Sequence, residues 1–212
     1  MKLYTKTIIL IFITISFGFT QPGGFKIIGG ITYSNIEPKT SYKRTNPLLG
    51  LKLGFEGMPS ISILHGITFT QRGYSYYLES IMTDGEGGNT VVTTEIDYLI
   101  NTFTGYLFKQ FNTQTGIYLL VGGEMGYNFK GEIIKKICSD NDCESSTADS
   151  TYNTLDYGIM VGGRLPINER LSLIGTYYWG LADIYHSTEH RKENRTTSIY
   201  LSYSLSKFLS KK

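Results

Sequence analysis

The chain has 212 residues, with 20 Lys and Arg against 18 Asp and Glu, which gives a formal net charge of +2. It contains 24 Gly, 17 Tyr and 11 Phe but only two Cys, and its mean hydropathy is −0.12. One long apolar segment stands at the start and no second one follows, which excludes a helical membrane protein. Outside that segment there is no basic run or nucleic-acid motif, so nucleic-acid binding has little support.

Residues 1–20 have the layout of a cleavable secretory signal. Lys2 and Lys6 give a basic start, and an apolar run extends from Ile8 to Phe19. This run is shorter than the roughly 20 apolar residues that a membrane-spanning helix needs. We therefore expect residues 1–20 to be removed and residues 21–212 to form one domain. Loss of the two lysines leaves 18 basic and 18 acidic residues, a net charge of zero.

Eight segments are predicted as β-strands, because apolar and other residues alternate along them with a period of two. The alternation is clearest after Leu155, where Tyr157, Ile159 and Val161 are separated by small or polar residues. Several segments are as long as the roughly 9 to 11 residues that a tilted strand needs to cross a bilayer. In chain order, the eight segments are 25–34, 49–56, 61–77, 91–108, 115–130, 155–165, 171–182 and 198–206.

Short and long connections alternate between these segments. The short ones are 57–60, 109–113 and 166–169, and the long ones are 35–46, 80–90, 131–151 and 186–194. This alternation is typical of an outer-membrane barrel with short turns in the periplasm and long loops outside. The sequence therefore predicts an all-β fold, an eight-stranded antiparallel up-and-down transmembrane β-barrel, with both termini in the periplasm.

The polar face of the strands is predicted to line the barrel lumen, while the apolar face meets lipid. Lys26 is one charged residue on this face, and aromatic residues near strand ends, such as Tyr74, Tyr76 and Tyr77, are expected to form interfacial girdles. Eight strands enclose a space that side chains fill, so opposite charges should pair there rather than line a pore. The predicted lumenal charge network comprises Lys52, Glu56, Arg72, Glu124, Lys130, Asp156 and Arg164.

The two cysteines stand close together as CSDNDC in the longest predicted loop. Cys138 and Cys143 are expected to form a disulfide, because an exported protein meets oxidising conditions. A metal site would need more ligands than two thiols, and the neighbouring acids lack the spacing of a calcium loop. The sequence thus predicts neither a metal nor another cofactor.

Several stretches resemble the PorT-like small outer-membrane barrels of Bacteroidetes and their relatives. They are LDYGIMVGGRLPINERLSLIGTYYWGL at residues 155–181, TQRGYSYY at 70–77, DYL at 97–99 and YLLVGGEMGYNF at 118–129. Gly66 and Thr102 depart from the Glu and Pro that the family pattern favours at these places. The resemblance implies the barrel fold, and the secretion role of the family's named member is not carried over.

The predicted function is that of an outer-membrane barrel whose outer loops serve as a structural, adhesive or partner-binding surface. Its expected partners are outer-membrane lipid and another envelope or surface protein. No enzymatic role is predicted. Three alternatives stay open: a narrow solute channel, a secreted lipocalin-like barrel, and a lipid-modifying enzyme. The last would need a His and Ser pair at the outer rim. The candidates are His186 and His190, which flank Ser187 and Glu189 in the last predicted loop.

Overall fold

A computed structural model describes residues 25–38, 45–60, 62–83, 89–139, 142–150, 153–183 and 192–205. All strand pairs within these ranges are antiparallel. Over the same ranges, no helix is long and apolar enough to span a membrane. The strands are β1 (Phe25–Pro38), β2 (Thr45–Ser60), β3 (Ile63–Thr83), β4 (Asn89–Asn112), β5 (Tyr118–Ser139), β6 (Asp142–Ser150), β7 (Leu155–Pro166), β8 (Leu171–Gly180) and β9 (Lys192–Ser204).

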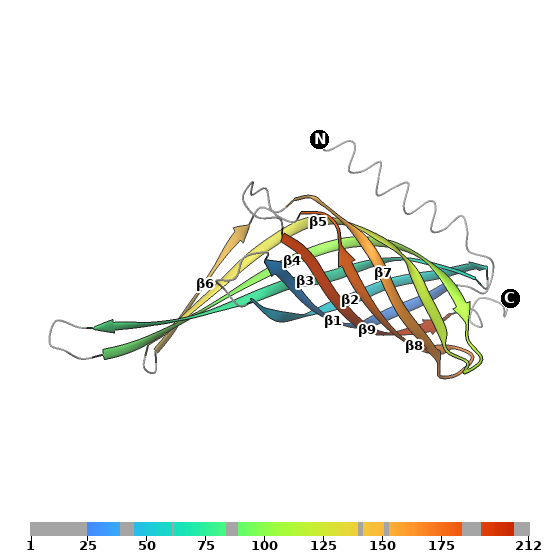
Figure 1. Cartoon of the computed structure of the whole chain (residues 1–212), viewed down its shortest axis with the longest axis horizontal. Helices are drawn as coiled ribbons and strands as arrows, with labels where there is room; N and C mark the ends of the chain where they lie inside the picture. The colour runs from blue at the N-terminus through green and yellow to red at the C-terminus, as the bar shows by residue number, and fades with distance from the viewer. Residues whose placement is uncertain are drawn as a thin grey trace.

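Eight of these strands close into a ring (Figure 1). The order is β1-β2-β3-β4-β5-β7-β8-β9, and β9 returns to pair with β1. The two ends of the described chain lie together, since the Leu205 N–H donates a hydrogen bond to the Phe25 carbonyl oxygen at 3.0 Å. The turns at 113–117 and 167–170 share that end of the barrel, which we call the terminal end.

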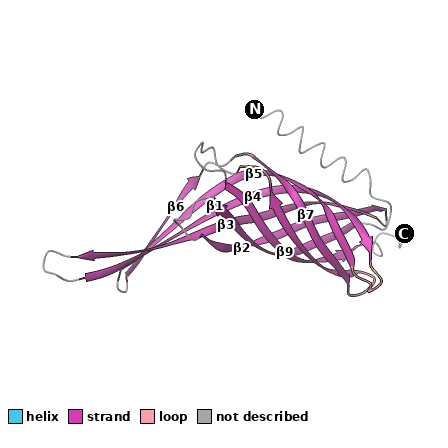
Figure 2. Ribbon diagram, in the orientation of Figure 1, coloured by secondary structure: helices cyan, strands magenta, loops and turns pink. Residues whose placement is uncertain are grey.

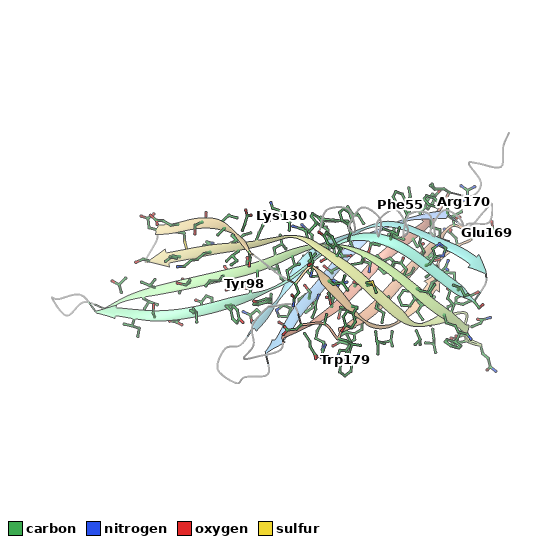
Figure 3. The ribbon with its side chains drawn as sticks, turned by 90° about the horizontal axis from the view of Figure 1, so that it is seen from above. Phe55, Tyr98, Lys130, Glu169, Arg170 and Trp179 are labelled. Carbon is green, nitrogen blue, oxygen red and sulfur yellow. A yellow bond between two sulfur atoms is a disulfide. The ribbon has the colours of Figure 1, made fainter. Side chains whose placement is uncertain are left out.

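The barrel wall follows the period-two alternation of the sequence. Ile159 on the outside is 52% exposed, whereas its neighbour Met160 on the inside is 1% exposed. Outward apolar side chains form a belt around the ring, and Figure 3 shows Phe55 and Trp179 projecting from the wall. Phe69, Phe103 and Phe129 form one aromatic cluster of this belt, at the end opposite to the termini.

The interior near the terminal end is filled by apolar residues. Leu64, Phe108 and Ile174 are each 0% exposed, and Ile28 and Leu120 pack in the same cluster. The inward face is thus mixed and not uniformly polar, because every strand of the ring except β2 contributes one or two residues to this cluster. The charged side chains lie in the same interior and pack against aromatic members of this cluster.

β3, β4 and β5 continue past the ring on the side away from the terminal end, and β6 joins them there (Figure 2). We call this extension the outer sheet and define it as residues 75–83, 89–97, 130–139 and 142–150. Its order is β3-β4-β5-β6, and β6 pairs with β5 alone among the described strands. Two of the predicted long loops, 80–90 and 131–151, are therefore mostly strand. In GEIIKKIC the doubled apolar and doubled basic residues hide the period of two.

Candidate functional site

Arg72 is at the centre of the charged groups in the lumen. It forms ion pairs with Glu124 and with Asp156, the latter at 2.8 Å. The Lys52 ammonium lies 3.5 Å from Glu124. These four side chains come from four different strands and are almost fully buried. Buried charges need partners of opposite sign, and here each carboxylate has at least one.

Polar and aromatic side chains complete the surroundings of Asp156 and Arg72. Asp156 accepts hydrogen bonds from the Tyr178 hydroxyl at 2.7 Å and from the Asn194 amide at 3.3 Å. The Arg72 guanidinium lies 4.4 Å from the centroid of the Tyr178 ring, at cation–π distance. Tyr178 therefore contacts both members of the ion pair, which fixes their relative position.

A second charged group lies beside the first. Glu56 accepts hydrogen bonds from Ser202 at 2.6 Å and from the Tyr106 hydroxyl at 3.5 Å. The Lys52 ammonium stands 5.3 Å from the centroid of the Tyr200 ring and 5.4 Å from that of Tyr106. Hydroxyl groups thus surround the Glu56 carboxylate, and aromatic ring faces surround the Lys52 ammonium.

Arg164 occupies the lumen between β7 and its neighbours. Its guanidinium donates to Ser172 at 3.1 Å and to the side-chain oxygen of Gln110 at 3.3 Å. With Lys26, the described interior holds four buried cations and three buried carboxylates. Their formal charges sum to +1, so the interior charge nearly cancels.

Six of the seven predicted lumenal charges lie inside the barrel, and Lys130 does not. Its side chain is 52% exposed and pairs with Glu132. The reason is a β-bulge: Asn101 pairs with Lys130 but Thr102 pairs with Asn128, so Phe129 has no opposite residue on β4. One extra residue reverses the facing of everything after it. The six inside are Lys52, Glu56, Arg72, Glu124, Asp156 and Arg164.

The tyrosines that hold this network were not recognised as such from the sequence. Tyr178 stands between Tyr177 and Trp179 near a strand end, where an interfacial girdle is expected, but its even position in β8 places it inward, with 2% exposure. Strict parity along β8 would have separated it from its two neighbours. Tyr106 lies in the predicted segment 91–108, where Glu95, Asp97 and Asn101 interrupt the alternation that would show its facing.

Tyr74 and Tyr76 also lie elsewhere than in a lipid-facing girdle. They stand on the inner side of the wall, where the outer sheet leaves the barrel, and form a cluster with Tyr98. Figure 3 labels Tyr98 at this place. The Tyr74 and Tyr98 rings stack with centroids 4.6 Å apart, and Tyr76 meets both edge-on. Burial raises the pKa of Tyr76 above its ordinary value. This cluster stiffens the base of the outer sheet.

The disulfide lies at the tip of the β5–β6 hairpin. Cys138 and Cys143 are directly opposite each other in the register, with an S–S distance of 2.13 Å and a Cα–Cα distance of 4.1 Å. The bond thus joins two paired strands at the point where the chain turns back, beyond the ring of the barrel.

The outer sheet carries an excess of acidic residues. Its four ranges contain seven acids and three lysines, which gives a net charge of −4. The hydrogen bond to Glu132 raises the pKa of Lys130 above its ordinary value. The acids are Glu79, Glu95, Asp97, Glu132, Asp142, Glu144 and Asp149, and the lysines are Lys130, Lys135 and Lys136.

No cluster of three or more His, Cys, Asp or Glu side chains with metal-binding geometry occurs among the described residues. The candidates for a rim catalytic pair, His186, Ser187, Glu189 and His190, lie outside the described residues. The predicted signal segment, residues 1–20, lies outside them too.

Comparison with known proteins agrees with this architecture. Residues 13–186 match the family model described as outer membrane protein beta-barrel domain. No curated protein sequence matches the chain significantly. Among solved structures, Neisserial surface protein A has a TM-score of 0.52 at 9% identity, over 85% of this chain and 96% of that one. This likeness confirms the predicted eight-stranded antiparallel barrel.

Two further structures score lower. Ail of Yersinia pestis, solved in complex with the heparin analogue sucrose octasulfate, has a TM-score of 0.46 at 14% identity, over 86% of this chain and 99% of that one. OprG of Pseudomonas aeruginosa has a TM-score of 0.38 at 13% identity, over 88% and 98%. The narrower resemblance to PorT-like barrels stays a prediction. The family model spans most of the chain, which therefore belongs to the outer membrane protein beta-barrel domain family.

Proposed function

We propose that this barrel is a membrane anchor that holds the acidic outer sheet above the cell surface as a binding surface for a protein partner. The observation that carries the proposal is the length of β3, β4 and β5 beyond the apolar belt. β3 continues from Phe69 in the belt to Thr83, which is 14 residues further on. At about 3.3 Å per residue, that is about 45 Å along the strand.

The shape supports one orientation in the membrane. The short turns lie at one end with Phe25 and Leu205, the two ends of the described chain. We place this end in the periplasm, and the outer sheet then projects from the opposite surface. The outward apolar belt contacts lipid. In this proposal, residues 1–20 direct export of the chain as a signal peptide and are then removed.

The filled interior argues for a role outside the barrel rather than through it. Charged groups in the lumen pair with one another, and Leu64, Phe108 and Ile174 fill the interior near the terminal end. An eight-stranded barrel leaves about enough room for its own side chains. The surface available for specific recognition is then the outer sheet with the connections at its end of the barrel.

The net charge of the outer sheet indicates the kind of partner. Seven acids against three lysines attract a basic surface and accelerate its encounter, and they repel an acidic one. We therefore favour partner binding over a purely structural role for this surface.

Orientation can be tested by labelling lysines on intact cells with a membrane-impermeant amine reagent and mapping the labelled peptides. Lys135 and Lys136 of the outer sheet should react, whereas Lys52 in the lumen and Lys109 near the terminal end should react only after lysis and denaturation. Replacement of Lys135 and Lys136 by Arg is the matched control, which should remove their signal and keep the charge. Labelling of Lys109 but not Lys135 on intact cells would reverse the proposed orientation.

Binding can be tested with the purified protein in lipid nanodiscs and two probe peptides, one alternating Lys with Thr and one alternating Glu with Thr. The basic peptide should bind and the acidic one should not. The triple variant Glu79→Gln, Glu95→Gln, Asp97→Asn should weaken binding of the basic peptide, while neutral exchanges such as Thr93→Ser should not. Equal binding of both peptides would refute the charge argument.

A further inference from the structure

The free edge of β6 is a second feature of the outer sheet. β6 has β5 on one side and no described strand on the other, and its residues 142–149 are all exposed. An edge strand offers a row of backbone N–H and C=O groups to any extended segment that approaches it. The question is which residues of β6 point these groups outward.

The Cα–Cα distance of Cys138 and Cys143 answers it. At 4.1 Å, the two residues form a non-hydrogen-bonded pair, because hydrogen-bonded antiparallel pairs have Cα atoms about 5.5 Å apart. The backbone groups of Cys143 therefore point away from β5. Orientation alternates along the strand, so the outward groups belong to Cys143, Ser145, Thr147 and Asp149.

The hydrogen bonding of β5 supports the same assignment. Asn128 faces inward, and its N–H donates at 2.9 Å to Thr154, on the side of β5 that β6 and β7 share. Side-chain facing and N–H direction alternate together along a strand. Beyond the bulge, Ile133, Lys135 and Ile137 lie on the face of β5 that continues the inner wall, so their backbone groups bond to β6. Ile137 is opposite Glu144, and these two residues therefore form a hydrogen-bonded pair.

Two of the residue types that commonly block strand addition are absent from this edge. The sequence of β6, DCESSTADS, contains no proline and no lysine, both of which commonly protect edges. The disulfide holds one end of the hairpin in register, and pairing of β5 with β4 supports the rest. An edge fixed in this way needs little further ordering when another strand binds to it.

We propose that β6 receives an extended basic segment of the partner protein as an added strand. This inference rests on the proposed function and names how the partner binds. Backbone hydrogen bonds to Ser145 and Thr147 would supply affinity. Asp142, Glu144 and Asp149 would select basic side chains on the incoming strand, since cross-strand pairs of opposite charge are favourable.

A second copy of this chain fits the edge less well. Pairing of β6 with β6 would bring together two strands that each carry three acids and no basic residue. Like charges placed against each other across an interface disfavour association. The charge of β6 thus prevents pairing between copies and favours a basic partner.

Proline substitution tests this proposal, because proline at an outward N–H removes a donor to the added strand and none to β5. In nanodiscs, Thr147→Pro and Ser145→Pro should each weaken binding of a Lys-Thr peptide of nine residues, the length of β6, by about tenfold. Thr147→Ala and Ser145→Ala keep the N–H and should bind like the unmodified protein. Heat-modifiable gel migration and thiol titration verify that each variant retains the barrel and the disulfide.

The outcomes separate the two proposals. Binding of the basic peptide that is unchanged by both prolines, but weakened by Glu95→Gln and Asp97→Asn, overturns strand addition and leaves the acidic surface standing. Absence of any preference for the basic peptide over the Glu-Thr peptide overturns both. Concentration-dependent self-association of the unmodified protein that Thr147→Pro abolishes would show that the edge takes a second copy, and would also overturn the proposal.

Discussion

The Arg72 guanidinium lies 2.8 Å from the Asp156 carboxylate, and this ion pair joins β3 to β7, two strands that β4 and β5 separate in the ring. The contact therefore crosses the lumen instead of following the wall. Together with the Glu124 pairs, it couples distant parts of the barrel that backbone hydrogen bonds do not connect directly.

The first prediction concerns this pair. Asp156→Leu should lower the free energy of unfolding by about 3 kcal/mol, because it leaves a buried cation short of a partner. The double variant with Arg72→Met should lose less than the sum of the two single losses, by about 1 kcal/mol or more. Urea unfolding of the protein in lipid vesicles measures all three values. Strictly additive losses would show that the two residues act independently.

A second prediction tests the facing of the wall. Val121→Arg and Ile159→Arg place a charge on the apolar belt and should each cost about 2 to 4 kcal/mol near the bilayer midplane. Lys130→Arg, at an exposed position beyond the belt, is the matched control and should leave stability unchanged. Folding yields in vesicles distinguish the cases, and a belt variant that folds as well as the control would contradict the assignment.

A third prediction concerns the cysteines. A thiol-reactive mass tag should label neither Cys138 nor Cys143 in the exported protein until a reductant is added. Replacing both by Ser should leave the barrel folded, since the bond closes a short loop beyond the ring. Heat-modifiable migration of the double variant checks the second point. Labelling without reductant would show that the bond does not form in the cell envelope.

The fourth prediction is that the purified protein gives no stable single-channel conductance in planar bilayers. Side chains fill the lumen of eight-stranded barrels, and aqueous channels belong to barrels of about 16 strands. Glu124→Ala removes the carboxylate that Lys52 and Arg72 share, and is the variant most suited to reveal a latent path. Protein-dependent steps that disappear on heat denaturation would support the channel alternative.

The barrel wall was predictable from sequence because its two faces meet two different environments. From Leu155 to Leu165, lipid on one side and packed side chains on the other force a strict alternation, and the structure follows it residue by residue. The same rule placed Glu124 and Asp156 inside. Where both conditions hold, a period of two determines the facing of each side chain.

The outer sheet was not predictable in this way, since in the proposed orientation neither of its faces meets lipid. Ile133 and Ile134 are adjacent, as are Lys135 and Lys136, and no alternation identifies this strand. Pairing with β4 and β6 produces it instead. The inner position of Tyr74 required knowledge of the neighbouring strands, because an aromatic at a strand end fits either a girdle or a packed cluster.

The unpaired Phe129 also makes this point of the chain tolerant of a one-residue deletion. Without it, Lys130 would directly follow the inward Asn128, so the alternation would become regular, with Lys130 and Glu132 still outward and Ile133 still inward. Tyr98 and Ile100 would keep Ile133 and Gly131 as their neighbours on β5. The deletion would remove the local bend of the bulge and the stacking of Phe129 on Phe103 in the belt, while the outer sheet kept its pairing.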